Sequence, residues 1–231
     1  MRVGLLSDIH GNADALTVVL SAAHTENVSR ILCCGDYVGY YYAPGEVIGL
    51  LDAWDWRGVR GNHEDMLTRW ISGNSRAEIR AKYGSGLAKA AALPTGTISR
   101  IVSLPDRLEL LVDGRSVLVC HGAPWAADAY VYPNAPPETW ARMAEGGHDL
   151  IVHGHTHYPV VRQHGKSVIV NPGSVGQPRD RQPGACWALW DTTDMSVTLR
   201  RENYDPSRLV ARCALEDPDL PAIGQILTRT A

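Results

Sequence analysis

Ser7-Asp8-Ile9-His10-Gly11-Asn12 is the stretch of the sequence that decides the fold. It follows a short apolar run, residues 3–6, and precedes a segment with helical periodicity, so it predicts a strand, a loop and a helix. Ligands of open α/β sheets bind beyond the carboxyl ends of strands. Asp8 and His10 lie at such an end, where a carboxylate and an imidazole two residues apart can hold one metal ion. An isolated Asp-x-His pair is more often part of a polar loop than of a metal site. The rest of the sequence therefore decides between these two interpretations.

The composition indicates an ordinary globular protein. Of 231 residues, 45% are hydrophobic and 20% are charged, and the net charge of −3 provides no basic field for nucleic acid or an anionic membrane. No apolar run reaches the length of about 18 residues that a membrane span needs, and no signal-peptide pattern precedes residue 3. We therefore expect a cytoplasmic protein. The five cysteines, an odd number without a Cys-x-x-Cys pair, are expected to be reduced and buried.

The first part of the chain alternates strand and helix patterns. Strands are predicted at residues 3–6, 30–34 and 56–59, and helices at 13–23 and 44–51, which favours a parallel sheet covered by helices. Residues 65–93 carry two helical stripes and no strand pattern. We interpret them as a helical insert, which is either a lid beside the site or a packing layer.

From about residue 107 the pattern becomes antiparallel. Asp113-Gly114 is a strong hairpin signal between predicted strands 107–112 and 116–120. Further strands are predicted at 149–153, 160–162, 167–170, 187–190 and 196–200, and helices from Pro136 and from Asp205-Pro206. The tail after Asp217 has no clear pattern.

Five polar groups each follow an apolar run, where a strand is predicted to end. They are Asp8 with His10, Gly35-Asp36, Gly61-Asn62-His63-Glu64, His121, and Gly154-His155-Thr156-His157. Loops at one edge of a sheet converge, so these groups can form one site. The mixture of carboxylates, imidazoles and an amide suits divalent Mn, Fe, Zn or Co better than Ca or Mg alone.

This ordered set resembles the calcineurin-like metallophosphoesterase superfamily, whose pattern is D-x-H, G-D, G-N-H-[D/E], H and G-H-x-H. All five blocks occur in that order across residues 8–157, and residues 171–180 resemble the small prokaryotic phosphoesterase branch. We therefore expect a single domain over residues 1–231. Its expected fold is a four-layer α/β/β/α sandwich in which two mixed sheets are flanked by helices, with the helical insert around 65–93.

The resemblance implies a site for two divalent metal ions. One ion would be bound by Asp8, His10, Asp36 and His157, and the other by Asp36, Asn62, His121 and His155, so that Asp36 is shared. The ions would lie about 3.5–4 Å apart, with a bridging hydroxide as the nucleophile. Manganese is the metal we expect first, and iron, zinc, nickel or cobalt are the alternatives.

The resemblance also implies that His63 faces the substrate instead of a metal ion. It would protonate the leaving group as a general acid, a role typically worth ~10²–10⁴-fold in rate. Glu64 and Asp65 are interpreted as a solvated helix start. Arg179 is a candidate phosphate contact, although a surface arginine explains its position nearly as well.

The remaining candidates have simpler interpretations. We expect His153, on an apolar strand before Gly154, to be buried and hydrogen-bonded. His24, His148 and His164 are expected at the surface. The run Tyr40-Tyr41-Tyr42 either lines a pocket and stacks a nucleobase or packs against the insert.

The functional hypothesis is a metal-dependent hydrolase of phosphodiesters or phosphomonoesters, with nucleotides among its candidate substrates. The alternative is a non-catalytic metal-binding scaffold for protein contacts, because the retromer scaffold subunit resembles these enzymes. Protein Ser/Thr phosphatases of the superfamily carry Asp-Arg-Gly after the second block, whereas this chain has Gly39-Tyr40-Tyr41. We expect a small phosphate ester as partner, without double-stranded nucleic acid or a membrane, and either a monomer or a homo-oligomer.

Overall fold

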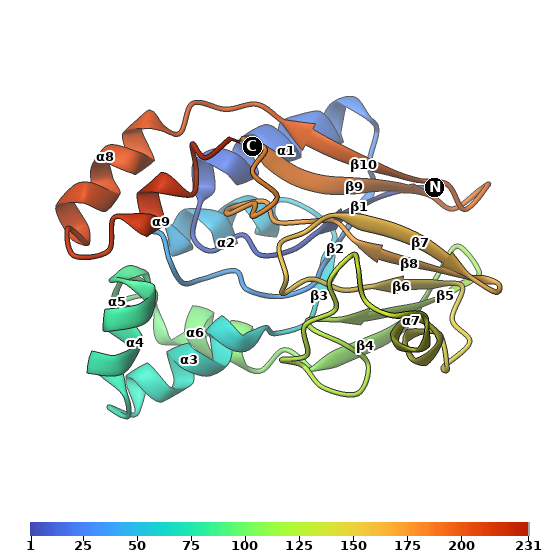
Figure 1. Ribbon diagram of the computed structural model, residues 1–231, viewed down its shortest axis with the longest axis horizontal. Coiled ribbons are helices and arrows are strands. Elements are labelled where there is room, and N and C mark those ends of the chain that lie inside the picture. Colours follow the sequence, from blue (N-terminus) through green and yellow to red (C-terminus); the bar gives the residue numbers. More distant parts are fainter. Residues whose placement is uncertain (231) are drawn as a thin grey trace.

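The computed structural model describes residues 1–230 and contains two five-stranded sheets (Figure 1). The strands are β1 (Arg2–Leu6), β2 (Arg30–Cys33), β3 (Trp56–Gly58), β4 (Arg107–Val112), β5 (Arg115–Cys120), β6 (Leu150–Val152), β7 (Val160–His164), β8 (Ser167–Asn171), β9 (Ala185–Asp191) and β10 (Val197–Glu202). The helices are α1 (Ala13–Thr25), α2 (Pro44–Asp52), α3 (Asn62–Ile71), α4 (Arg76–Tyr83), α5 (Gly86–Ala90), α6 (Thr95–Val102), α7 (Pro137–Met143), α8 (Ser207–Glu216) and α9 (Ala222–Gln225).

Each sheet combines three neighbouring parallel strands with two strands that pair antiparallel. The first sheet has the order β10-β9-β1-β2-β3, in which β1, β2 and β3 are parallel and β9 and β10 are antiparallel. The second has the order β4-β5-β6-β8-β7, in which β5, β6 and β8 are parallel and the two edge strands are antiparallel. The predicted polar groups follow β1, β2, β3, β5 and β6, which all belong to the parallel parts of the two sheets.

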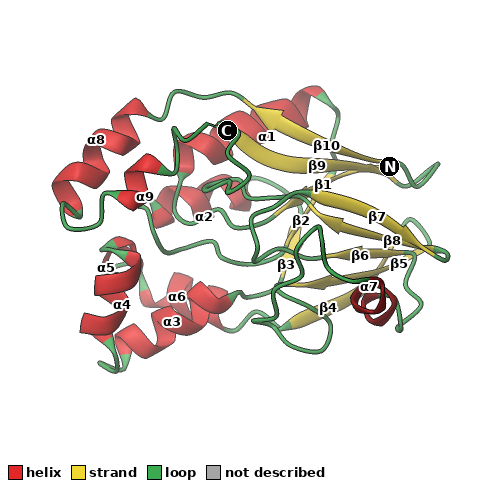
Figure 2. Cartoon of the chain, viewed as in Figure 1, coloured by secondary structure: helices red, strands yellow, loops and turns green. Residues whose placement is uncertain are grey.

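Side-chain alternation along the strands creates the layers. Val3 and Leu5 of β1 pack in one cluster with Val119 and Val152 of the second sheet, so the sheets meet face to face. On the opposite face of the first sheet, Leu6 packs with residues of α1 and α2. On the outer face of the second sheet, α7 supplies Trp140 and Met143. The predicted four-layer sandwich is therefore confirmed, and the other helices gather at the left end in Figure 2.

The helical insert is longer and more broken than predicted. Helices α3 to α6 extend to residue 102, and Gly84, whose φ is +76°, divides the second of the two predicted helical stripes into α4 and α5. The sequence analysis missed α6, because Gly96 and the β-branched residues Ile98, Ile101 and Val102 favour helix weakly. Burial of Ile101 in the cluster that includes Leu67 of α3 stabilises it there.

The C-terminal tail, which had no clear pattern, packs against the tyrosine run. Tyr41 and Tyr42 form a buried cluster with Leu209 of α8 and Ile223 of α9. These two tyrosines therefore pack against the C-terminal helices, and neither interpretation of the run describes them. The five cysteines are free and buried, as predicted. None of the helices in residues 1–230 combines the length and hydrophobicity needed to cross a membrane.

Asp217 connects this tail to the insert. Its side chain is buried, and Oδ2 accepts hydrogen bonds from the Tyr42 hydroxyl at 2.8 Å and from the Ser85 amide and hydroxyl at 3.0 and 3.1 Å. A buried donor left without its acceptor costs about 1–3 kcal/mol. One carboxylate thus holds α8, the start of α5 and the tyrosine run together.

We predict that Asp217→Ala lowers the free energy of unfolding by roughly 2–4 kcal/mol, since it leaves three donors without an acceptor. Urea denaturation measures the change. Asp219→Ala is the matched control, because Asp219 lies two residues away and is exposed; it should change stability by less than about 0.5 kcal/mol. Equal effects of the two substitutions would show that the Asp217 connection contributes nothing.

Candidate metal centre

Three buried donors meet beyond the ends of β1 and β6. Nε2 of His157 lies 3.3 Å from Oδ1 of Asp8 and 3.1 Å from Nε2 of His10. Nε2 of His10 lies 3.8 Å from the same Asp8 oxygen. These three atoms therefore form a compact triangle of one carboxylate oxygen and two imidazole nitrogens.

A second group lies beyond β2, β3, β5 and β6. Nε2 of His121 lies 2.9 Å from Oδ1 of Asn62, 3.0 Å from Nδ1 of His155 and 3.5 Å from Oδ2 of Asp36. The same Asp36 oxygen is 3.8 Å from Nε2 of His10 in the first group. The structure thus brings all seven predicted donors together, with Asp36 between the two groups.

The spacing of the donors fits metal ligands. Two ligands about 2.0–2.1 Å from one ion and about 90° apart lie about 3 Å from each other. The His10–His157 and His121–His155 nitrogen pairs have this separation, at 3.1 and 3.0 Å. Oδ1 of Asp8 is buried without a hydrogen-bond partner, whereas Oδ2 accepts from Ser7 and from the His155 amide. The buried clusters are therefore consistent with a dinuclear site.

Backbone carbonyls orient three of the imidazoles. Nδ1 of His10, His121 and His157 lies within hydrogen-bond distance of the carbonyl oxygens of Val38 (3.3 Å), Cys34 (2.6 Å) and Gln177 (2.6 Å), respectively. A carbonyl only accepts, so Nδ1 carries the proton and Nε2 presents its lone pair. In all three residues the atom that faces the cluster is the one able to bind a cation.

The backbone at the site is strained. Asp8, His10, Asp36, His155 and His157 all have φ between 54° and 68°, in the left-handed region. Such a conformation costs a non-glycine residue of order 1–2 kcal/mol. Five of the seven donors therefore depend on surrounding packing to hold them, which is common at functional sites.

Glu64 supplies part of that packing. Its buried carboxylate accepts four backbone N–H bonds: Oε1 from Tyr37 (2.9 Å) and Val38 (3.3 Å), and Oε2 from Asp36 (2.9 Å) and Gly61 (2.8 Å). Burial and the nearby Asp36 carboxylate raise the pKa of Glu64, whereas the four amides can only donate and therefore favour the ionised carboxylate. The interpretation of Glu64 as solvated is wrong, because a sequence cannot show that two loops fold around it. Asp65 is exposed and pairs with Arg60.

His63 lies at the edge of the donor groups. Its Nε2 is 4.0 Å from Oδ2 of Asp36, and its Nδ1 is buried without a hydrogen-bond partner. The rings of His10, Tyr40 and Tyr83 surround the imidazole at centroid distances of 4.6, 4.9 and 5.2 Å. The His63 ring is therefore positioned by aromatic packing, with no hydrogen bond to a carboxylate within residues 1–230.

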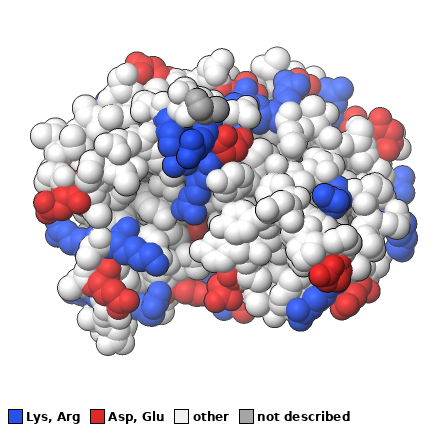
Figure 3. Space-filling view, viewed as in Figure 1, with Lys and Arg blue, Asp and Glu red and all other residues white. Residues whose placement is uncertain are grey.

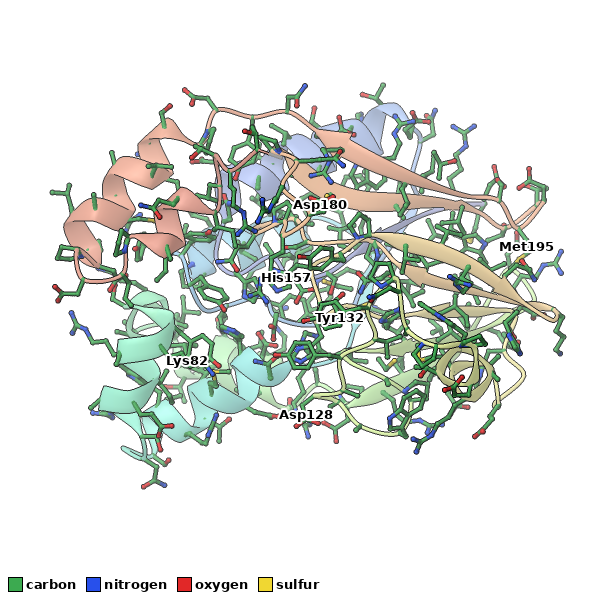
Figure 4. The ribbon with its side chains drawn as sticks, in the orientation of Figure 1. Lys82, Asp128, Tyr132, His157, Asp180 and Met195 are labelled. Atoms are coloured by element: carbon green, nitrogen blue, oxygen red, sulfur yellow. The ribbon has the colours of Figure 1, made fainter. Side chains whose placement is uncertain are left out.

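The site opens into a cavity of about 150 Å³. Its walls include His63, Asp36, Arg179 and, from the insert, Lys82 and Tyr83. Figure 4 labels Lys82 and His157 on either side of this region. The sequence analysis missed Lys82, Tyr83 and Tyr130 as cavity residues, since they belong to no motif.

Tyr40 and Arg179 meet at the cavity wall. The ring centroids of Tyr40 and Tyr83, a residue of the insert, lie 5.7 Å apart, so Tyr40 both lines the cavity and packs against the insert. The guanidinium of Arg179 donates to the Tyr40 hydroxyl and to Oε1 of Gln177, both at 3.1 Å. Arg179, the predicted candidate phosphate contact, thus lines the cavity.

The remaining histidines lie outside the donor groups. His24 and His164 are exposed as predicted, whereas His148 is half-buried and its Nε2 lies 3.4 Å from Glu109. His153 is fully buried, but neither ring nitrogen has a hydrogen-bond partner within residues 1–230. The expectation of a hydrogen-bonded His153 is therefore wrong, because β6 places its ring beside Trp140 in an apolar layer.

Comparisons with known proteins give a family match and several similar structures. Residues 1–195 match the model of the calcineurin-like phosphoesterase superfamily domain. An uncharacterized protein of Methanocaldococcus jannaschii is 28% identical over 222 residues, 88% of each chain. A metallophosphoesterase from Sphaerobacter thermophilus superposes with a TM-score of 0.80 at 28% identity, covering 99% of this chain and 98% of its own. A hypothetical protein from Pyrococcus horikoshii shares the fold, with a TM-score of 0.84 at 21% identity and coverage of 100% and 99%.

We predict that Glu64→Gln destabilises the protein by roughly 2–4 kcal/mol. An amide NH₂ would replace one carboxylate oxygen and face two N–H donors that need an acceptor. Chemical denaturation measures the loss, and Asp65→Asn is the matched control because the neighbouring Asp65 is exposed. If both variants unfold at the same denaturant concentration, Glu64 does not hold the loops.

A second prediction concerns His153 and pH. Burial lowers the pKa of His153 from 6.5 to about 4, so the unfolded chain takes up a proton in this window that the folded chain excludes. The folded state therefore loses stability relative to His153→Leu as the pH falls from 6.5 to 4. Between pH 7 and pH 4, the stability difference should move by roughly 2–3 kcal/mol in favour of the variant. Urea titrations with a metal chelator test this, and a pH-independent difference would contradict it.

Proposed function

The chain belongs to the calcineurin-like phosphoesterase superfamily, and we propose that it is a dinuclear metal-dependent phosphoesterase. It would hydrolyse phosphomonoesters or phosphodiesters, with nucleotides among the candidate substrates. The observation that carries the proposal is the pair of buried donor groups joined by Oδ2 of Asp36 beneath a cavity. The family and the donor chemistry support the class of reaction.

The proposed ligands follow the two groups. Asp8, His10, His157 and Asp36 would hold one ion, and Asp36, Asn62, His121 and His155 the other. Manganese suits this mixture of nitrogen and oxygen donors, as do iron, zinc, nickel and cobalt. When bound, two such ions would activate a bridging water as nucleophile and neutralise developing charge on the phosphate.

The cations in the cavity would bind the phosphate. Lys82 and Arg179 both line it, and neither pairs with a carboxylate within residues 1–230. Tyr40 and Gln177 are neutral partners, so they position the Arg179 guanidinium without cancelling its charge. A planar guanidinium matches the geometry of phosphate oxygens, which supports a substrate contact for Arg179.

His63 would supply the proton to the leaving oxygen. Burial and the imidazoles of His157 and His121 lower the pKa of His63, so the free protein holds it neutral at pH 7. The negative charge of a bound phosphate favours the protonated imidazole. Since Nε2 lies beside Asp36 at the cavity, a proton on this atom would be within reach of the ester.

We predict Mn-dependent hydrolysis of p-nitrophenyl phosphate or bis-p-nitrophenyl phosphate by the metal-stripped protein after Mn is restored. The preferred compound identifies the ester class. His63→Gln should retain two bound Mn ions, measured by elemental analysis, and lose ~10²–10⁴-fold in kcat because it cannot transfer the proton. His24→Gln is the control, since His24 is exposed outside the site.

Each other result has a defined meaning. Full activity of His63→Gln would be compatible with the proposed metal centre and would exclude His63 as the general acid. A wild-type protein that binds two Mn ions but hydrolyses neither ester would contradict the catalytic proposal and favour the alternative, a metal-binding scaffold for protein contacts.

A further inference from the structure

The segment after β5 is held firmly beside the candidate metal centre. It begins at Gly122, next to His121, where a Cβ would lie 2.5 Å from the Ala127 carbonyl oxygen. Val131 is buried in the cluster of Trp140 and anchors the far end of the segment. The segment is therefore a fixed wall of the site, although it contains no long helix or strand.

Two tyrosines on this segment point away from the core. Alternation around buried Val131 leaves Tyr130 57% and Tyr132 40% exposed. Their rings are nearly parallel, with an interplanar angle of 12° and centroids 5.8 Å apart. Exposure of two large aromatic rings to water is unfavourable. Such exposed aromatic surface commonly marks a binding site, where a ligand covers the rings.

The tyrosines run outward from the donor groups. The ring centroid of Tyr130 lies 4.1 Å from that of His155, and Tyr130 lines the cavity. The ring centroid of Tyr132 lies 5.7 Å from that of Tyr158, the residue directly after His157. Figure 4 labels Tyr132 and His157 near the centre of the view. We define Tyr130, Tyr132 and Tyr158 as the tyrosine platform.

The cavity borders both cationic side chains and the uncharged tyrosine platform. Lys82 and Arg179 lie in its wall with Tyr130, whereas the platform itself carries no charge. Figure 3 shows lysine and arginine atoms on the left of the central hollow and uncharged surface on its right. A ligand with an anionic end and a flat apolar end matches this division.

We propose that Tyr130 and Tyr132 form a stacking subsite for a planar aromatic ring, so that the substrates are phosphate esters of nucleosides. The inference rests on the proposed function for the position of the phosphate at the donor groups. Aromatic side chains stack on every base because each base has a π-face, and one such contact contributes ~5- to 100-fold in affinity. Stacking on Tyr130 and Tyr132 selects for the base while the metal centre and its cations take the phosphate.

Equilibrium binding to the Mn-loaded protein tests the subsite without requiring turnover. One probe is 5′-deoxyadenosine 5′-methylphosphonate, whose carbon–phosphorus bond resists hydrolysis; the other is ethylphosphonate, which lacks the base. Tyr130→Ala and Tyr132→Ala should each lower the ratio of the two affinities by ~5- to 100-fold. Tyr130→Phe and Tyr132→Phe are matched controls that keep the rings and should hold the ratio within about threefold. Thermal melting verifies that every variant is folded.

The results separate the subsite from the reaction. The stacking subsite would be overturned if the alanine variants left the ratio of the two affinities unchanged. It would also be overturned if the phenylalanine variants lowered that ratio as much as the alanine variants do. If the ratio falls as expected while the wild type hydrolyses no ester, the subsite is supported and the proposed function fails. If the wild type hydrolyses esters and the ratio does not respond, the function stands and the subsite is wrong.

Discussion

The position of the Asp36 carboxylate is the constraint on which the rest of the site depends. Its Oδ2 lies within 3.5–4.0 Å of Nε2 of three histidines, and its Oδ1 accepts the backbone N–H of His63. The Asp36 amide is held by Glu64, and a Cβ at Gly61 would lie 2.2 Å from Oδ1. The loops after β2 and β3 can therefore approach each other closely only because Glu64 is buried between them and residue 61 is a glycine. This approach fixes the position of Asp36 and so the distance between the two donor groups.

The same arrangement is costly without a cation. Asp8 and Asp36 are buried in one cluster, and burial raises the pKa of Asp36 while it lowers that of His10. Five strained donor residues add to the cost. A divalent ion that binds only the folded chain stabilises it by about 2.7 kcal/mol at a hundred times its dissociation constant. Metal binding and folding of these loops are thus expected to be strongly coupled.

The donor residues and the two mixed sheets could be predicted because both depend on short sequence patterns. Asp8, Asp36 and His121 each lie within two residues of the end of an apolar run, and carboxyl ends of parallel strands meet at one edge. Glu64 was missed because a carboxylate at a helix start is usually solvated, and only the tertiary fold brings four amides around it. Helices α6 and α9 were missed because burial, and not helix propensity, stabilises them.

The walls of the cavity were missed for a different reason. The donors come from strand ends, whereas Lys82 comes from α4 and Tyr130 from the irregular segment after β5. These segments are anchored outside the site, by Asp217 at the start of α5 and by Val131 beneath the platform. Their exposed side chains can consequently change without disturbing the spacing of the donors. On the proposed function, the metal chemistry would belong to the fold as a whole, while the choice of ester would depend on two peripheral segments that no motif marks.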